Sequence, residues 1–242
     1  MKPPSHRYSW HIARDIFACF AKWVVGVWLL LVAVIGAIIA GIAMFSQPEV
    51  SIFAFTLNPA PYWILVFGAI LPATMLRHYV ANGVTRRDFV WGAGLASVGL
   101  SGLAAVLGTV ALVAEGRLYA SAGWSHVSEN PHLFTSTDQI GLVFVELLLI
   151  FGSHMFAGWA AGAMFYRFGA WATPGAVLAY CVAASIDVLL GAGWAGRVVL
   201  DNVYKFTPSW MLAAGVGLVA MAALFLLSKQ LLRQVPVPAK SS

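Results

Sequence analysis

Residues 77–92 read RHYVANGVTRRDFVWG, a short polar connection between two long apolar stretches of the chain. Asn82 and Gly83 both tolerate the backbone angles that a sharp reversal requires. Thr85 follows where its side chain can cap a new helix, and the charged run Arg-Arg-Asp at residues 86–88 comes directly after it. The pattern predicts a tight, charged turn that ends one apolar helix and begins the next.

The composition on either side of this turn is typical of a membrane protein. Of the 242 residues, 61% are hydrophobic and only 10% are charged, and the mean hydropathy is +0.84. A helix needs about 20 mostly apolar residues to cross the ~30 Å hydrocarbon layer, and none of the apolar stretches alternates as barrel strands do. We therefore expect one all-α transmembrane domain over residues 1–242. Its six spanning helices are expected at about residues 20–45, 60–77, 89–114, 139–165, 170–191 and 208–229.

The Lys and Arg residues are distributed unevenly between the two sides of these spans. Eleven of the fourteen fall on the side of the two termini: Lys2, Arg7, Arg14, Lys22, Arg77, Arg86, Arg87, Arg167, Lys229, Arg233 and Lys240. Only Arg117, Arg197 and Lys205 fall on the other side. Because cytoplasmic connections carry the excess of basic residues, we expect both termini in the cytoplasm. The net charge of +5 then reflects membrane topology and does not indicate a nucleic-acid partner.

Residues 8–19 begin an amphipathic segment that leads into the first span. Its polar face carries His11, Arg14, Asp15 and Lys22, opposite Ile12, Ile16, Phe20 and Trp23. A helix of this kind lies in the headgroup plane with its apolar side toward the lipid. We therefore expect a separate interfacial helix, the alternative being that the segment is only the charged flank of the first span.

Three features concern how the spans pack. Pro72, inside the second span, predicts a kink. Gly158 and Gly162 have the spacing that lets helix backbones approach closely, either within the bundle or at a dimer contact. Residues 191–208 are broken by glycines and amphipathic, and they are too short to span, so we expect a re-entrant segment before the sixth span.

Two acidic residues lie inside apolar spans, where an unpaired charge is costly. Glu146 lies about 12 Å into the fourth span, and Asp187 lies near the outer end of the fifth. Together with His154 in the fourth span, they are candidates for a translocation path or a gate. The alternative is a structural role, in which hydrogen-bonded acids fix the packing of the helices or of the re-entrant segment.

The sequence motifs of common catalytic sites are missing. No Lys follows a Gly, so the chain has no GxxxxGK[ST] phosphate loop, and HExxH, CxxC and GxSxG are also absent. We therefore expect no catalytic residue, metal site or cofactor on this chain. ATP hydrolysis by the phosphate-loop route would need a separate subunit.

Six spans, an amphipathic segment before the first and a basic turn after the second resemble the ABC-2 type permeases, the membrane subunits of bacterial ABC exporters. In that family a cytoplasmic motif of the form R…GvSRr.f..gk follows the second span. The matching residues here are Arg77, Gly83, Val84, Thr85, Arg86, Arg87, Phe89 and Gly92. Thr85 stands where the family usually has Ser, and Ala93 stands where it usually has Lys.

The resemblance implies a coupling helix that docks on a separate ABC ATPase. Its coupling residues would be Gly83, Val84, Thr85, Arg86, Arg87, Asp88 and Phe89. It also implies two ATPase copies that bind ATP and Mg, and a second copy of this permease or a similar one across the translocation path. The apolar spans suit an amphiphilic cargo such as a drug, a peptide antibiotic or a lipid. Two alternative functions are an integral-membrane enzyme acting on a lipid-linked substrate, and a scaffold or sensor subunit that does not transport.

Overall fold

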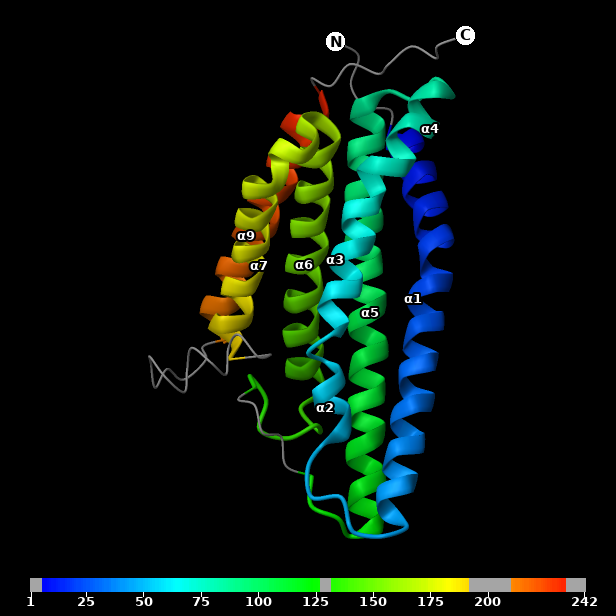
Figure 1. Ribbon diagram of the computed structural model, residues 1–242, viewed down its shortest axis with the longest axis vertical. Coiled ribbons are helices and arrows are strands. Elements are labelled where there is room, and N and C mark those ends of the chain that lie inside the picture. Colours follow the sequence, from blue (N-terminus) through cyan, green and yellow to red (C-terminus); the bar gives the residue numbers. More distant parts are fainter. Residues whose placement is uncertain (1–5, 127–131, 192–209, 234–242) are drawn as a thin grey trace.

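The protein is an elongated bundle of long helices, seen here in a computed structural model that describes residues 6–126, 132–191 and 210–233 (Figure 1). The described part contains no β-strand. Its elements are α1 (His6–Ala43), α2 (Ile52–Thr56), α3 (Ala60–Ile70), the π-helical turn η1 (Leu71–Met75), α4 (Leu76–Ala81), α5 (Arg86–Ala122), α6 (Ile140–Phe168), the 3₁₀ turn η2 (Gly169–Ala172), α7 (Thr173–Leu190) and α9 (Trp210–Arg233). The expected all-helical class is confirmed.

Five helical stretches are long and apolar enough to cross a membrane: Tyr8–Ala43, Ile52–Ala81, Arg86–Ala122, Ile140–Leu190 and Met211–Arg233. The fourth stretch consists of two helices, α6 and α7, which η2 joins and which run antiparallel side by side (Figure 1). The chain therefore has the construction of a multi-pass membrane protein.

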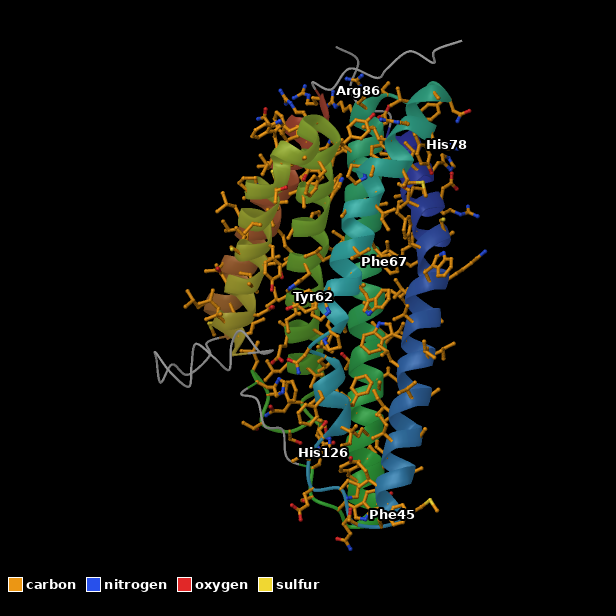
Figure 2. The ribbon with its side chains drawn as sticks, in the orientation of Figure 1. Phe45, Tyr62, Phe67, His78, Arg86 and His126 are labelled. Carbon is orange, nitrogen blue, oxygen red and sulfur yellow. The ribbon has the colours of Figure 1, made fainter. Side chains whose placement is uncertain are left out.

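Successive long helices run in opposite directions, and α1 and α5 therefore run parallel to each other, with α3 and α4 returning between them (Figure 1). The start of α1, the turn at residues 82–85, η2 and the end of α9 all lie at one end of the bundle, which we call the basic end. Figure 2 shows His78 and Arg86 there, and Phe45 and His126 at the opposite end. Among the described Lys and Arg residues, Arg117 is the one that lies near the opposite end, on the last turns of α5.

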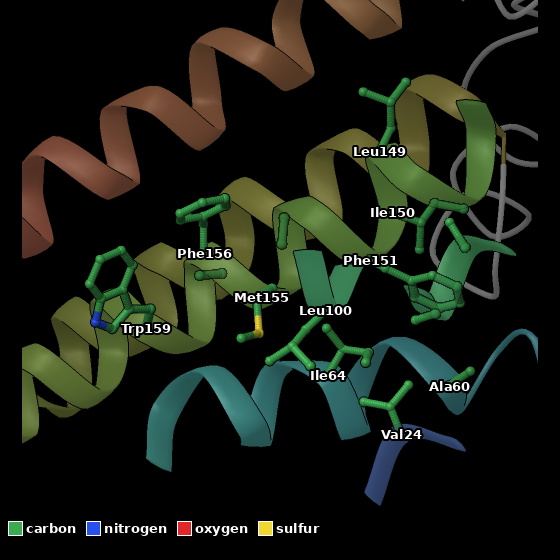
Figure 3. Close-up of a cluster of buried hydrophobic side chains, with 14 of the residues drawn as sticks. Val24, Ala60, Ile64, Leu100, Leu149, Ile150, Phe151, Met155, Phe156 and Trp159 are labelled. Carbon is green, nitrogen blue, oxygen red and sulfur yellow. The ribbon is translucent and has the colours of Figure 1, made fainter. Parts of the chain in front are cut away.

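The core is organised around α6, which packs against α3, α5, α7 and α9. Phe151, Met155 and Trp159 of α6 are fully buried, and Ile64 of α3 and Leu100 of α5 approach them from the neighbouring helices (Figure 3). Helices that are apolar on all sides are expected to bury whichever face meets another helix and to leave the rest to lipid.

The backbones of α3 and α6 come into direct contact at glycines. A Cβ atom on Gly158 would overlap the carbonyl oxygen of Leu65, and one on Gly162 would overlap that of Ala69. A Cβ atom on Gly68 of α3 would likewise overlap the carbonyl oxygen of Met155. The predicted close approach at Gly158 and Gly162 is confirmed, and it is made within the chain.

The separate interfacial helix expected over residues 8–19 is not formed, because α1 continues without a break from His6 to Ala43. Its buried stripe includes Ile12, Ile16 and Phe20, and α1 packs along α5. A Cβ on Gly92 of α5 would collide with Ile12, so the absence of a side chain at Gly92 lets α1 pack closely against α5. The apolar face thus meets protein, and the segment is the charged flank of the first long helix.

The irregularity predicted at Pro72 takes the form of the π-helical turn η1. Proline has no N–H to bond the carbonyl four residues earlier, which permits the wider turn. A re-entrant segment was expected at residues 191–208. Of these, only Gly191 lies within the described part of the chain.

Candidate functional site

The connection between α4 and α5 is a compact turn at the basic end. Gly83 has a positive φ of 82°, which L side chains rarely adopt. The N–H of Val84 donates to the carbonyl of Tyr79 (3.0 Å), and the side chain of Asn82 donates to the carbonyl of His78 (2.8 Å). These bonds satisfy carbonyl groups that the end of α4 would otherwise leave unpaired. The sharp reversal predicted at Asn82 and Gly83 is confirmed.

Thr85 caps the helix that follows. Its Oγ1 accepts the N–H of Asp88 (3.1 Å), and its hydroxyl donates to Asp88 Oδ2 (2.7 Å). Thr85 thus caps the start of α5, and Asp88 is an acid in the first turn, where the helix dipole favours it. The predicted cap is confirmed.

Residues 83–88 do not form a short helix of their own. The turn ends at Thr85, and Arg86 is the first residue of the 37-residue helix α5. Nothing after the cap interrupts the hydrogen bonding before Gly123, which ends α5 in the left-handed conformation. Phe89 is fully buried, with its ring centroid 5.7 Å from that of Tyr79.

The charged residues after the cap have different surroundings. Arg87 is exposed, whereas Arg86 and Asp88 are half-buried. Arg86 Nη1 donates to the carbonyl of Arg233 at the end of α9 (3.4 Å), and Ser9 of α1 donates to Asp88 Oδ1 (3.5 Å). The turn is therefore connected to α1, α4, α5 and α9, so a force applied to it reaches several long helices.

Glu146 lies toward the opposite end of the bundle and is 1% exposed. Its Oε1 is 2.7 Å from Nδ1 of His132, and its Oε2 accepts the N–H of Leu133 (2.7 Å). Both carboxylate oxygens are thus bonded to the segment that connects α5 to α6. This geometry favours a structural role, in which the buried acid holds the connection against the bundle.

Glu115 of α5 forms a second buried acid–histidine pair that the sequence did not reveal. Its carboxylate accepts the hydroxyl of Ser51 and the N–H of Phe53 (2.8 Å), and it lies 3.1 Å from Nε2 of His126. The pair fastens the start of α2 and the α5–α6 connection to α5. The sequence pattern that could have indicated this pair is Glu115 near the end of an apolar stretch, followed by His126 and His132.

His154 and Asp187, which were predicted as separate candidates, are brought together. Nε2 of His154 on α6 lies 3.5 Å from Oδ2 of Asp187 on α7, while Nδ1 donates to the carbonyl of Ile150 (2.9 Å). The hydroxyls of Tyr62 and Tyr180 are 3.2 Å apart, and both rings meet the His154 ring edge to face. The two tyrosines were not predicted.

This cluster, His154, Asp187, Tyr62 and Tyr180, sits between α3, α6 and α7. Asp187 Oδ1 has no hydrogen-bond partner among the described residues. His154 Nε2 has none either, so the 3.5 Å approach to Asp187 is a close contact and not a hydrogen bond. Glu146 lies eight residues, about 12 Å, before His154 along α6, and its hydrogen bonds go to His132 and Leu133.

Across residues 6–126, 132–191 and 210–233, no three His, Cys, Asp or Glu side chains are grouped as metal ligands would be. The polar groups form acid–histidine pairs, and Glu115 of one pair also accepts the hydroxyl of Ser51.

Comparisons with protein-family models, with curated proteins and with solved structures each find no match to this chain. The fold and the buried polar groups define a multi-pass helical membrane protein.

Proposed function

We propose that the protein is the permease subunit of an ATP-driven exporter of the ABC-2 type, with six spanning helices formed by α1, α3 with α4, α5, α6, α7 and α9. The observation that carries the proposal is the turn at residues 82–85, a rigid connection with an exposed Arg87 at the basic end of the bundle. A soluble ATPase that moves during hydrolysis needs a stiff, charged contact point tied to several spans, and this turn has those properties.

In the proposed complex two ATPase copies bind ATP and Mg and dock below the basic end. A second copy of this chain, or a similar permease, completes the translocation path for an amphiphilic cargo. The docking surface consists of the exposed turn with Arg86 and Arg87, while Gly83, Thr85 and Asp88 hold its shape. Buried Phe89 and half-buried Val84 fix the turn to the bundle core. His154 and Asp187 are the stronger candidates for a gate, because neither is tied to an external connection as Glu146 is.

The basic end is expected in the cytoplasm of a bacterial cell, since basic residues accumulate on that side of the membrane. Cysteine labelling tests this orientation in a background in which the exposed native Cys19 and Cys181 are replaced by Ser. Ser125→Cys, at the opposite end, should react with an impermeant maleimide in intact cells. Thr85→Cys should react only after permeabilisation. Labelling of Thr85→Cys in intact cells would reverse the proposed orientation.

Reversing both arginines of the turn, Arg86→Glu with Arg87→Glu, should weaken ATPase binding by at least ~10-fold. Charge-assisted contacts are worth about 1.5–3 kcal/mol each where they are partly desolvated, and ~1.4 kcal/mol corresponds to a tenfold change. The measurement is co-purification of the ATPase from the native host, together with ATP turnover in lipid discs.

Arg167→Glu is the control, because Arg167 is exposed at the same end of the bundle but lies outside the turn. It should retain the ATPase. If the double reversal keeps the ATPase at the native stoichiometry and activity, the arginines only anchor the topology. If the native chain captures no ATPase, the proposal of a transport subunit fails.

A further inference from the structure

A basic cavity lies between α5 and α9 at the basic end. It has a volume of about 270 Å³ and is lined by Arg87, Val90, Trp91, Lys229 and Arg233. The ammonium of Lys229 lies over the Trp91 ring, 5.1 Å from its centroid. None of the three cations forms an ion pair with a residue in the described ranges. The cavity therefore concentrates positive charge that no described carboxylate neutralises.

The nearest described acid on α5, Asp88, is bonded to Thr85 and Ser9. The positive charge of the cavity is therefore suited to binding an anion that the described part of the chain does not provide.

An apolar groove continues from the cavity along the same two helices, and α6 contributes Phe156 to it. It has a volume of about 230 Å³ and is lined by Trp91, Gly94, Leu95, Val98, Phe156, Met221, Ala222 and Phe225. Trp91 belongs to both the cavity and the groove. Gly94 leaves room for the ring of Phe225, since a Cβ there would approach that ring to 2.6 Å. No charged side chain lines this groove.

Along the bundle axis, the lining changes from cationic side chains, through the indole of Trp91, to apolar side chains. This order is complementary to an amphiphile with an anionic headgroup. Arg87, Trp91, Leu95 and Val98 follow one another on one face of α5, and the last three are 39%, 49% and 56% exposed. From Arg87 to Val98 the helix rises about 16 Å, enough for a headgroup and the first part of an acyl chain. An indole between the charged and apolar parts is typical of a side chain at the membrane interface.

We infer that this cavity and groove form a binding site for one anionic phospholipid. Arg87, Lys229 and Arg233 bind the phosphate and any further headgroup charge, Trp91 lies beside the glycerol, and one acyl chain occupies the groove. Basic pockets between membrane helices are suited to anionic headgroups, and guanidinium groups bind phosphate through paired hydrogen bonds. The site shares Arg87 with the proposed ATPase-docking turn. Lipid binding itself requires no ATPase, so its test through Lys229 and Arg233 does not rest on the proposed transport function.

The test compares phosphatidylglycerol with phosphatidylcholine of the same acyl chains by native mass spectrometry of the delipidated protein. The native chain should bind phosphatidylglycerol at least ~10-fold more tightly, as two or more charge-assisted contacts predict. Lys229→Gln with Arg233→Gln should abolish this preference. Arg14→Gln with Arg167→Gln, which removes two exposed charges from the same half of the bundle, should retain it.

A separate variant tests whether an acyl chain occupies the groove. Val98→Trp should fill the groove and weaken the binding of phosphatidylglycerol while leaving the cationic cavity intact. Equal binding of the two lipids by the native chain, or a preference that survives the Lys229 and Arg233 changes, would overturn the inference. So would displacement of phosphatidylglycerol by millimolar glycerol phosphate, because the cavity would then bind any phosphate without the acyl chain.

Discussion

Gly158→Ala is expected to lower the free energy of unfolding by about 3 kcal/mol, at the upper end of the range for overpacking a helix contact. A single methyl group is enough, because it would meet the backbone carbonyl of Leu65, which cannot rotate away as a side chain can. Relief requires α3 to move off α6, and that movement would also open the contacts at Gly68 and Gly162. The measurements are the thermal midpoint in detergent and the fraction of monodisperse protein.

Gly141→Ala provides the matched control on the same helix. No atom lies within 4 Å of the position where its Cβ would be placed. Alanine is a better helix former than glycine, so this variant should be as stable as the native chain or slightly more stable. If the Gly158 and Gly141 variants unfold at the same temperature, α3 and α6 do not make this backbone contact.

The positions of the long helices were largely predictable, because hydropathy reports directly on the length of an apolar stretch. The stretch predicted at 89–114 lies within α5, and that predicted at 139–165 overlaps α6 almost completely. The ends were less predictable. α5 continues to Ala122 until Gly123 caps it, and polar helical turns beyond the lipid carry no hydropathy signal.

Local chemistry was predictable, and long-range pairing was not. Thr85 and Gly83 act on residues within three positions of themselves, so their roles could be inferred from the turn alone. The pairs Ser51–Glu115 and His154–Asp187 join residues that are far apart in the sequence. Their formation depends on which helices pack together, which a single sequence does not specify. The amphipathic start of α1 was misassigned for the same reason, since its apolar stripe fits either lipid or α5.

Glu146→Leu is expected to destabilise the protein by about 3 kcal/mol, the lower end of the range for breaking a buried charged pair. The change removes the acceptor for the N–H of Leu133 and the carboxylate beside His132. Glu146 is 1% exposed, so water cannot readily take over these bonds without opening the α5–α6 connection. The variant should unfold at a lower temperature, and its connection should be cleaved faster by protease.

Two further variants separate a structural role of Glu146 from a role in a translocation path. Asp138→Asn removes a carboxylate from the same connection, but the Asp138–Arg117 pair is 68% and 72% exposed and should contribute less than about 1 kcal/mol. Glu146→Gln keeps the shape and one acceptor oxygen, so it should be destabilised less than Glu146→Leu and should transport with native pH dependence. A Gln variant of native stability whose transport responds differently to pH would instead assign the carboxylate to the path. A Leu variant as stable as Asp138→Asn would show that the bonds to His132 and Leu133 do not hold the connection in place.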